Sequence, residues 1–86
     1  MDESPQQAEW RRWVEKQAPK FLLFARQQAR SETDAQDLVQ EALVEASRRQ
    51  NDSRPPQPAL VFATIRRRAI DLARREDRRA EREHSA

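Results

Sequence analysis

Glycine and cysteine are both absent from this chain of 86 residues. Without cysteine the chain can form neither a disulfide nor a thiolate metal site. Without glycine, the tight β-hairpin turns that need a positive φ could be formed only by Asn and Asp, which disfavours a β architecture. These two absences predict an all-α domain that is held together by side-chain packing.

Apolar residues are also scarce, at 36% of the chain against 37% charged residues, and the mean hydropathy is −1.15. A chain of this length buries only roughly 60–65% of its unfolded surface, so it has one thin core and no room for a deep pocket. No apolar run approaches the roughly 18 residues of a membrane span, and the N-terminus is acidic and polar, unlike a signal peptide. The simplest expectation is a cytoplasmic protein.

Chemistry-bearing side chains are few as well. The only histidine, His84, lies near the C-terminus, where no carboxylate or hydroxyl is expected to be held beside it, so it is unsuited to act as a general base or a metal ligand. Asp34 and Asp37 are better explained as partners of a helix dipole than as an acid/base pair. The sequence therefore predicts no catalytic residue, no metal site and no cofactor.

The charges are divided unevenly between the two halves of the chain. Residues 1–45 carry six basic and nine acidic groups, whereas residues 46–86 carry eleven basic groups, all arginine, and six acidic ones. Because guanidinium groups bind phosphate well, the basic half favours an anionic partner, with nucleic acid the first candidate. The alternative is a solvated helix whose arginines are balanced by its own carboxylates.

Capping patterns and apolar spacing predict three to four helices. Ser4 and Gln7 form a capping box for a helix that runs to about Gln17, and Pro19 begins a second helix or bends one longer helix, which the sequence leaves open. Thr33 and Gln36 form a second capping box, with Asp34 and Asp37 in the first turn. The apolar residues that follow have the spacing of a buried helix face: Ala35, Leu38, Val39, Ala42, Leu43 and Ala46.

The polar, proline-containing composition of residues 51–57 predicts a loop that is too long for the turn of an ordinary helix-turn-helix, and Pro58 is expected to begin the last helix. The inner face of that helix is expected to hold Val61, Ile65, Ala69, Leu72 and Ala73. Past about Glu76 no apolar residue larger than alanine remains, which predicts fraying. We therefore expect a folded domain over residues 1–77, with residues 78–86 as a mobile tail or a linker towards an absent C-terminal domain.

Two outward faces follow from about 100° of rotation per residue. The helix over residues 33–46 carries polar residues and one exposed aliphatic side chain opposite its core stripe: Asp37, Gln40, Glu41, Val44 and Arg48. Val44, framed by carboxylates and an amide, could be a lone exposed residue or the centre of a docking surface.

The last helix carries a basic face. It is formed by Arg67, Arg74 and Arg78, with Asp71 among them, Arg68 and Arg75 at its margin, and Arg66 pointing elsewhere. Asp71 can pair with Arg67 four residues earlier or with Arg75 four residues later, which would neutralise part of this face. Such a face suits a phosphate backbone, without preference for a DNA sequence.

The segment DAQDLVQEALVEASRR, residues 34–49, closely resembles region 2 of bacterial sigma factors, above all the extracytoplasmic-function (ECF) type. FLLFARQQ upstream resembles the preceding helix of that domain, and ALVFATIRRRAIDLARREDRR downstream resembles its promoter-reading helix. The matching segments extend from about Trp10 to Arg79. The family often has a tryptophan near Leu60 and an asparagine near Arg67, where this chain differs.

The resemblance implies a domain that binds RNA polymerase core and promoter DNA, and leaves open whether an anti-sigma factor covers it. In the family, the helix matching residues 34–49 docks on the clamp helices of the β′ subunit, which implies a polymerase-binding role for Asp37, Gln40 and Glu41, with Val44 on the same face. The loop before the last helix captures a base flipped from the −10 promoter element, and the last helix contacts the same segment. The implied DNA-binding residues are Asn51, Asp52, Ser53, Arg54, Arg66, Arg67, Arg74, Arg75 and Arg78.

A complete sigma factor of this type also carries a C-terminal domain that reads the −35 element, of which the sequence shows no trace. The chain is therefore a fragment or a standalone relative. The alternative function is a helical interaction module, a sigma mimic or adaptor, whose arginines only solvate the last helix.

Overall fold

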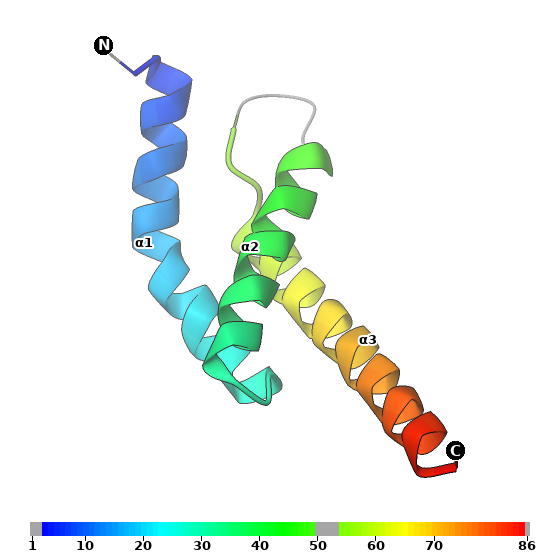
Figure 1. Ribbon diagram of the computed structural model, residues 1–86. Coiled ribbons are helices and arrows are strands. Elements are labelled where there is room, and N and C mark those ends of the chain that lie inside the picture. Colours follow the sequence, from blue (N-terminus) through cyan, green and yellow to red (C-terminus); the bar gives the residue numbers. More distant parts are fainter. Residues whose placement is uncertain (1–2, 50–53, 86) are drawn as a thin grey trace.

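The computed structural model describes residues 3–49 and 54–85, and in these ranges the chain forms three helices and no strands. They are α1 (Pro5–Gln28), α2 (Glu32–Arg49) and α3 (Pro58–Ser85). α1 and α2 run side by side in opposite directions, and α3 crosses them and then projects away from the body (Figure 1). The all-α prediction is confirmed. None of the helices in these ranges is both long and apolar enough to cross a membrane.

α1 is one continuous helix, so the long-helix alternative left open by the sequence is the right one. The predicted capping box is present: the Ser4 hydroxyl accepts from the Gln7 amide at 3.2 Å, and the Gln7 side chain accepts from the Ser4 amide at 3.1 Å. Pro19 lies inside the helix and has no N–H to donate to the carbonyl of Glu15. The helix axis changes direction along this part of the chain (Figure 1).

α2 begins earlier than the sequence predicted, and its cap is not Thr33. The Ser31 hydroxyl accepts from the Asp34 amide at 3.1 Å, which makes Ser31 the capping side chain. Gln36 donates to the Glu32 carboxylate at 3.3 Å and does not close a box with Thr33. Glu32 and Asp34 occupy the first turn, where carboxylates favour the helix dipole, and Asp37 lies beyond it.

The core is small and rich in alanine, which lets the three helices approach closely. α1 contributes Phe21 and Ala25, and the predicted stripe of α2 is buried except for Leu43, which packs at the edge. Val61, Ile65 and Ala69 bring the first half of α3 against them, while Leu72 and Ala73 are half-buried. The core therefore fixes α2 against α3, the two helices that carry the candidate site.

Aromatic side chains join α1 to the start of α3. The rings of Phe21 and Phe62 lie 5.0 Å apart, and those of Phe24 and Phe62 lie 5.4 Å apart, both edge to face. Trp13 extends the cluster by packing on Phe21 at 5.7 Å. The aromatic residues are thus engaged in holding the fold together.

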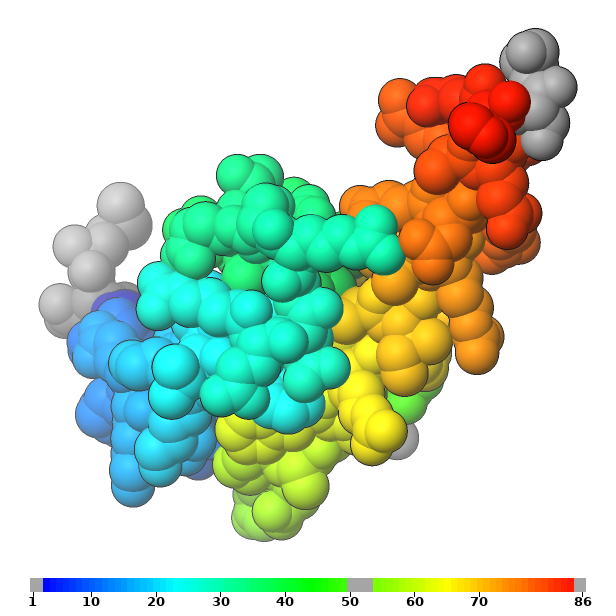
Figure 2. Space-filling view, turned by 90° about the horizontal axis from the view of Figure 1, so that it is seen from below, coloured from blue at the N-terminus to red at the C-terminus, as the bar shows by residue number. Residues whose placement is uncertain are grey.

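The second half of α3 corrects a further prediction, because the helix continues to Ser85 where fraying was expected past Glu76. Its side chains from Asp77 to His84 are all exposed, and this part projects from the body in a second view (Figure 2). Arg30, which precedes α2, binds Glu76 and Asp77, each at 3.0 Å, and Arg79 pairs with Glu83 at 3.1 Å. A linker role for residues 78–86 stays a prediction.

Candidate functional site

The first part of the site is the outer face of α2, which we call the α2 outer face and define as Asp37, Gln40, Glu41, Val44 and Arg48. All five side chains are exposed, as the spacing predicted, and half of the Val44 surface is open to solvent. All but Asp37 line an open surface depression together with Arg68 of α3. The face offers carboxylates and an amide around one aliphatic side chain.

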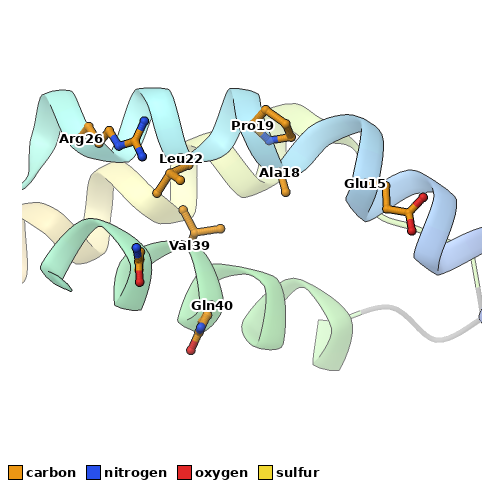
Figure 3. A pocket seen from close by; sticks show the side chains of 8 residues that line it. Glu15, Ala18, Pro19, Leu22, Arg26, Val39 and Gln40 are labelled. Atoms are coloured by element: carbon orange, nitrogen blue, oxygen red, sulfur yellow. The ribbon is translucent and has the colours of Figure 1, made fainter. Parts of the chain in front are cut away.

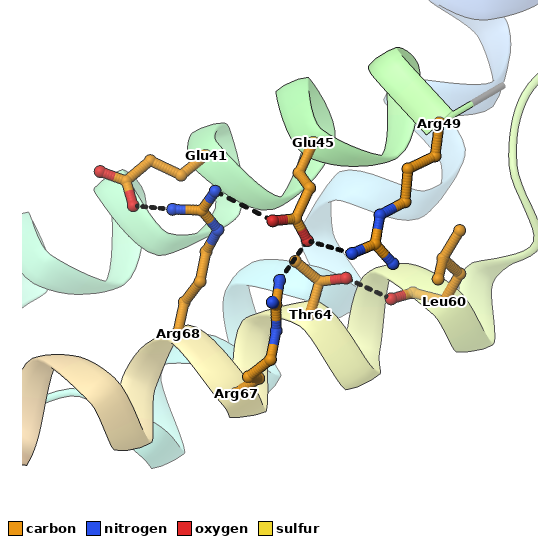
Figure 4. A network of polar contacts seen from close by, with 7 residues as sticks. All are labelled: Glu41, Glu45, Arg49, Leu60, Thr64, Arg67 and Arg68. Carbon is orange, nitrogen blue, oxygen red and sulfur yellow. Dashed lines mark hydrogen bonds and ion pairs between the residues drawn. The ribbon is translucent and has the colours of Figure 1, made fainter.

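Arg67 and Arg68 of α3 are held by carboxylates of α2 (Figure 4). Arg68 donates to Glu41 at 2.9 Å and to Glu45 at 3.2 Å, and Arg67 donates to the other oxygen of Glu45. Arg49 approaches Glu45 at 3.9 Å. We call these five residues the interhelical network. Asp71 forms no ion pair with Arg67 or Arg75 in the described residues, and Arg67 binds Glu45 across the helix crossing instead.

Glu45 is the centre of this network, and its carboxylate side chain is only 20% exposed. The hydrogen bond from Arg67, together with the charges of Arg67, Arg68 and Arg49, lowers the pKa of Glu45 although burial opposes this. The Nε atom of Arg68 is buried and has no hydrogen-bond partner in the described ranges. Nothing in the sequence indicated this role for Glu45, because Arg67 and Arg68, which bind it, lie on another helix, 22 and 23 residues away.

The second part of the site is a set of exposed arginines on α3, the α3 arginine face: Arg74, Arg75 and Arg78. Arg78 donates to the Arg74 carbonyl at 3.3 Å, so its side chain lies along the helix. The nearby carboxylates Glu76 and Asp77 are already bound by Arg30. None of the three cations takes part in an ion pair within the described residues, so they remain available to an anionic ligand.

The remaining predicted DNA-binding residues lie apart from that face. Asn51, Asp52 and Ser53 fall outside the described residues. Arg54 is exposed shortly before α3 begins, and Arg66 is exposed in the first half of α3. The structure thus brings Arg67 into the interhelical network and leaves Arg74, Arg75 and Arg78 together on the projecting half of α3.

A third feature, which the sequence gave no means to predict, is an open groove between α1 and α2 with a volume of about 560 Å³. Leu22 from α1 and Val39 from α2 point toward each other across it (Figure 3). Its full lining is Glu15, Ala18, Pro19, Leu22, Arg26, Gln36, Val39 and Gln40. Arg26 binds Glu32 through two hydrogen bonds of 2.8 Å, and this hydrogen bonding lowers the pKa of Glu32.

The described residues offer no centre for metal chemistry, since nowhere in them do three or more His, Asp or Glu side chains gather around a possible ion position. His84 is exposed near the end of α3. The arrangement consists of charged surfaces of opposite sign on two helices whose crossing is fixed by a shared core. Such a site can bind partners, and this defines a small all-helical binding domain.

Comparison with protein families assigns the domain more closely. The family model described as Sigma-70 region 2 matches residues 13–79, which covers most of the chain. The chain therefore belongs to the Sigma-70 region 2 family, which is not a family of enzymes. Membership indicates a sigma-factor-like role in RNA polymerase binding and promoter recognition. No curated protein sequence and no solved structure gives a match.

Proposed function

We propose that the chain is the region 2 domain of an ECF-type sigma factor, which acts in the cytoplasm as part of an RNA polymerase holoenzyme. The α2 outer face docks on the clamp helices of the polymerase β′ subunit. The α3 arginine face contacts the promoter near the −10 element, where strand separation begins. An anti-sigma factor that covered the α2 outer face would block the first of these steps.

One observation carries the docking half of the proposal: the exposed residues of α2 that match the family's polymerase-contact positions form one continuous face. Asp37 and Gln40 are exposed, and Asp37 takes part in no ion pair within the described residues. Glu41 is ion-paired with Arg68. Carboxylates here would repel DNA phosphates, so the face suits a protein partner with basic groups. Val44 supplies the apolar contact that a docking surface needs at its centre.

The DNA half rests on the exposed arginines of α3. Arg74, Arg75 and Arg78 lie within about one turn of one another, and none of them takes part in an ion pair within the described residues. Arg66 adds a further exposed cation closer to the loop. Each phosphate contact releases counterions, so affinity from these residues must depend on salt.

A second candidate function is an interaction module that docks on polymerase without binding DNA. The interhelical network favours it, because Arg67 and Arg68 are neutralised by Glu45 and Glu41. In addition, the described aromatic side chains are committed to the core and to one another, so none of them is evidently available to stack on an unpaired base. The two candidates share the docking step and differ only in DNA binding.

The docking step is tested by combining Gln40→Ala with Glu41→Lys and measuring binding to a purified β′ clamp-helix polypeptide. We expect binding to fall below detection because the change removes an amide and reverses a charge in the middle of the face, while circular dichroism shows unchanged helicity. The matched control combines Gln6→Ala with Glu9→Lys, two exposed positions on α1, and should bind like the unmodified chain. Unaltered binding by the α2 variant would reject the proposed function.

A further inference from the structure

The groove between α1 and α2 is an apolar opening that adjoins the α2 outer face. Ala18, Pro19, Leu22 and Val39 form its apolar surface, and Glu15, Arg26, Gln36 and Gln40 stand at its rim. Ala18 and Pro19 are too small to reach across to α2, which leaves a space of about 560 Å³. This is room for a large side chain from another molecule, not for an entire helix.

The groove is continuous with the proposed docking surface. Gln40 belongs to both, since it lines the groove on one side and the depression around Val44 on the other. Gln36 and Gln40 are one helical turn apart on α2, so they border the groove along the same edge. A partner helix that lies over Gln40 and Glu41 therefore passes directly beside the opening.

The charges around the groove indicate what kind of partner segment fits it. Between Glu32 and Ser47, α2 carries five carboxylates and no basic residue. At the rim itself Glu15 is paired with Arg11 and Arg26 with Glu32, while Asp37 and Glu41 lie beside Gln40 on the adjoining α2 outer face. An apolar floor beside the acidic α2 outer face is complementary to an apolar side chain flanked by Lys or Arg.

We propose that this groove receives a large apolar side chain from a basic segment of the polymerase clamp helices, and that it anchors the docking made by the α2 outer face. The inference rests on the proposed function for the identity of the partner. The charged face orients the partner, and the groove supplies burial of apolar surface, which charged contacts on an exposed face supply poorly. A single buried anchor surrounded by polar contacts is a common arrangement in protein interfaces.

The test fills the groove without changing its charge. Ala18→Trp places an indole in the opening, and Ala80→Trp makes the same substitution at an exposed site on the projecting half of α3. Binding of each variant to the β′ clamp-helix polypeptide is measured by titration calorimetry at several temperatures, with circular dichroism to check the fold. We expect Ala18→Trp to bind at least tenfold more weakly and Ala80→Trp to bind normally.

A second variant keeps the inference testable if the indole disturbs helix packing. Leu22→Gln keeps the length of the side chain but makes the floor polar, so it should weaken binding and make the heat-capacity change of binding less negative. If both groove variants bind normally while the Gln40→Ala, Glu41→Lys variant loses binding, the groove is not the anchor and the docking proposal still holds. Normal affinity of that last variant overturns the docking proposal itself. Self-association that the groove variants abolish would make a second copy of the chain the occupant and would also overturn the inference.

Discussion

The α2 outer face and the α3 arginine face differ in the sign of their charge and in how well their helices are packed against the core. α2 is packed by its inner stripe along nearly its whole length, from Ala35 to Ala46, so its acidic face is rigidly backed. α3 is packed only in its first half, and the arginine face begins where burial ends, beyond Ala69 and the half-buried Leu72. The comparison shows that the acidic face lies on the packed core, whereas the arginine face lies on the projecting end of α3.

The interhelical network is the place where the two surfaces meet. Glu41 belongs to the α2 outer face, while Arg67 and Arg68 lie on the helix that carries the arginine face. Their ion pairs hold α2 against α3 and withdraw two of the cations that the sequence assigned to one basic stripe. Of the predicted basic face, Arg74, Arg75 and Arg78 are therefore left without an ion pair in the described residues, and they lie on the C-terminal half of α3.

The largest effect should come from removing the support that both surfaces share. Ile65→Ala deletes a fully buried side chain at the crossing of α2 and α3 and should lower the free energy of unfolding by about 2–5 kcal/mol. In so small a domain this should weaken clamp-helix binding and DNA binding together. Urea unfolding measures the loss, with Ile70→Ala, at a partly exposed position on the same helix, as the control. A variant that lost only one of the two activities would show that the surfaces do not depend on a common core.

A second prediction separates the surfaces. Arg74→Ala combined with Arg78→Ala should reduce the slope of log affinity against log salt for a −10 single strand by about 1.4, at about 0.7 per phosphate contact. Clamp-helix binding should be unchanged, because neither residue lies on α2. Fluorescence anisotropy at several salt concentrations gives both the slope and the affinity.

The control for this experiment is Arg79→Ala, because Arg79 is engaged by Glu83 on the same projecting segment and should contribute less. Equal slopes for the unmodified chain and the double variant would favour the module that does not bind DNA. A −10 strand bound no better than an unrelated strand of equal length would show that the arginine face binds phosphate without reading the promoter.

The sequence predicted the parts of the fold that depend on neighbours along the chain. The Ser4–Gln7 box and the stripe from Ala35 to Ala46 follow from local spacing, and both are confirmed. The α2 outer face could be predicted for the same reason, since it lies opposite that stripe. Its role in polymerase binding stays a proposal.

The features that the sequence missed depend on contacts between helices. Glu45 looked like one more solvated carboxylate until α3 brought Arg67 and Arg68 beside it. The continuation of α3 is accompanied by ion pairs between Arg30, which precedes α2, and Glu76 and Asp77. No pattern of neighbouring residues predicts these pairs. The groove likewise needs two small residues of α1 opposite Val39 of α2. In each case the missing information was which helix faces which.

The smallest predicted effect concerns Glu45 and is visible mainly through pH. Arg67 lowers the pKa of Glu45 in the folded chain below its ordinary value of 4.5, so its contribution to stability is complete above that value and is lost as the pH falls through the lowered pKa. Glu45→Gln keeps the shape but removes the charge, and should cost about 0.2–1 kcal/mol near pH 7, as expected for an ion pair whose arginine, Arg67, is half exposed. At pH 3 the difference in stability from the unmodified chain should be smaller, because Glu45 itself then loses part of its charge.

Urea unfolding at the two pH values measures this difference. The matched control is Glu9→Gln, at an exposed carboxylate without an ion pair in the described ranges. A difference that stayed constant between the two pH values would mean that Glu45 joins α2 to α3 by packing alone, and that the two surfaces are not electrostatically linked.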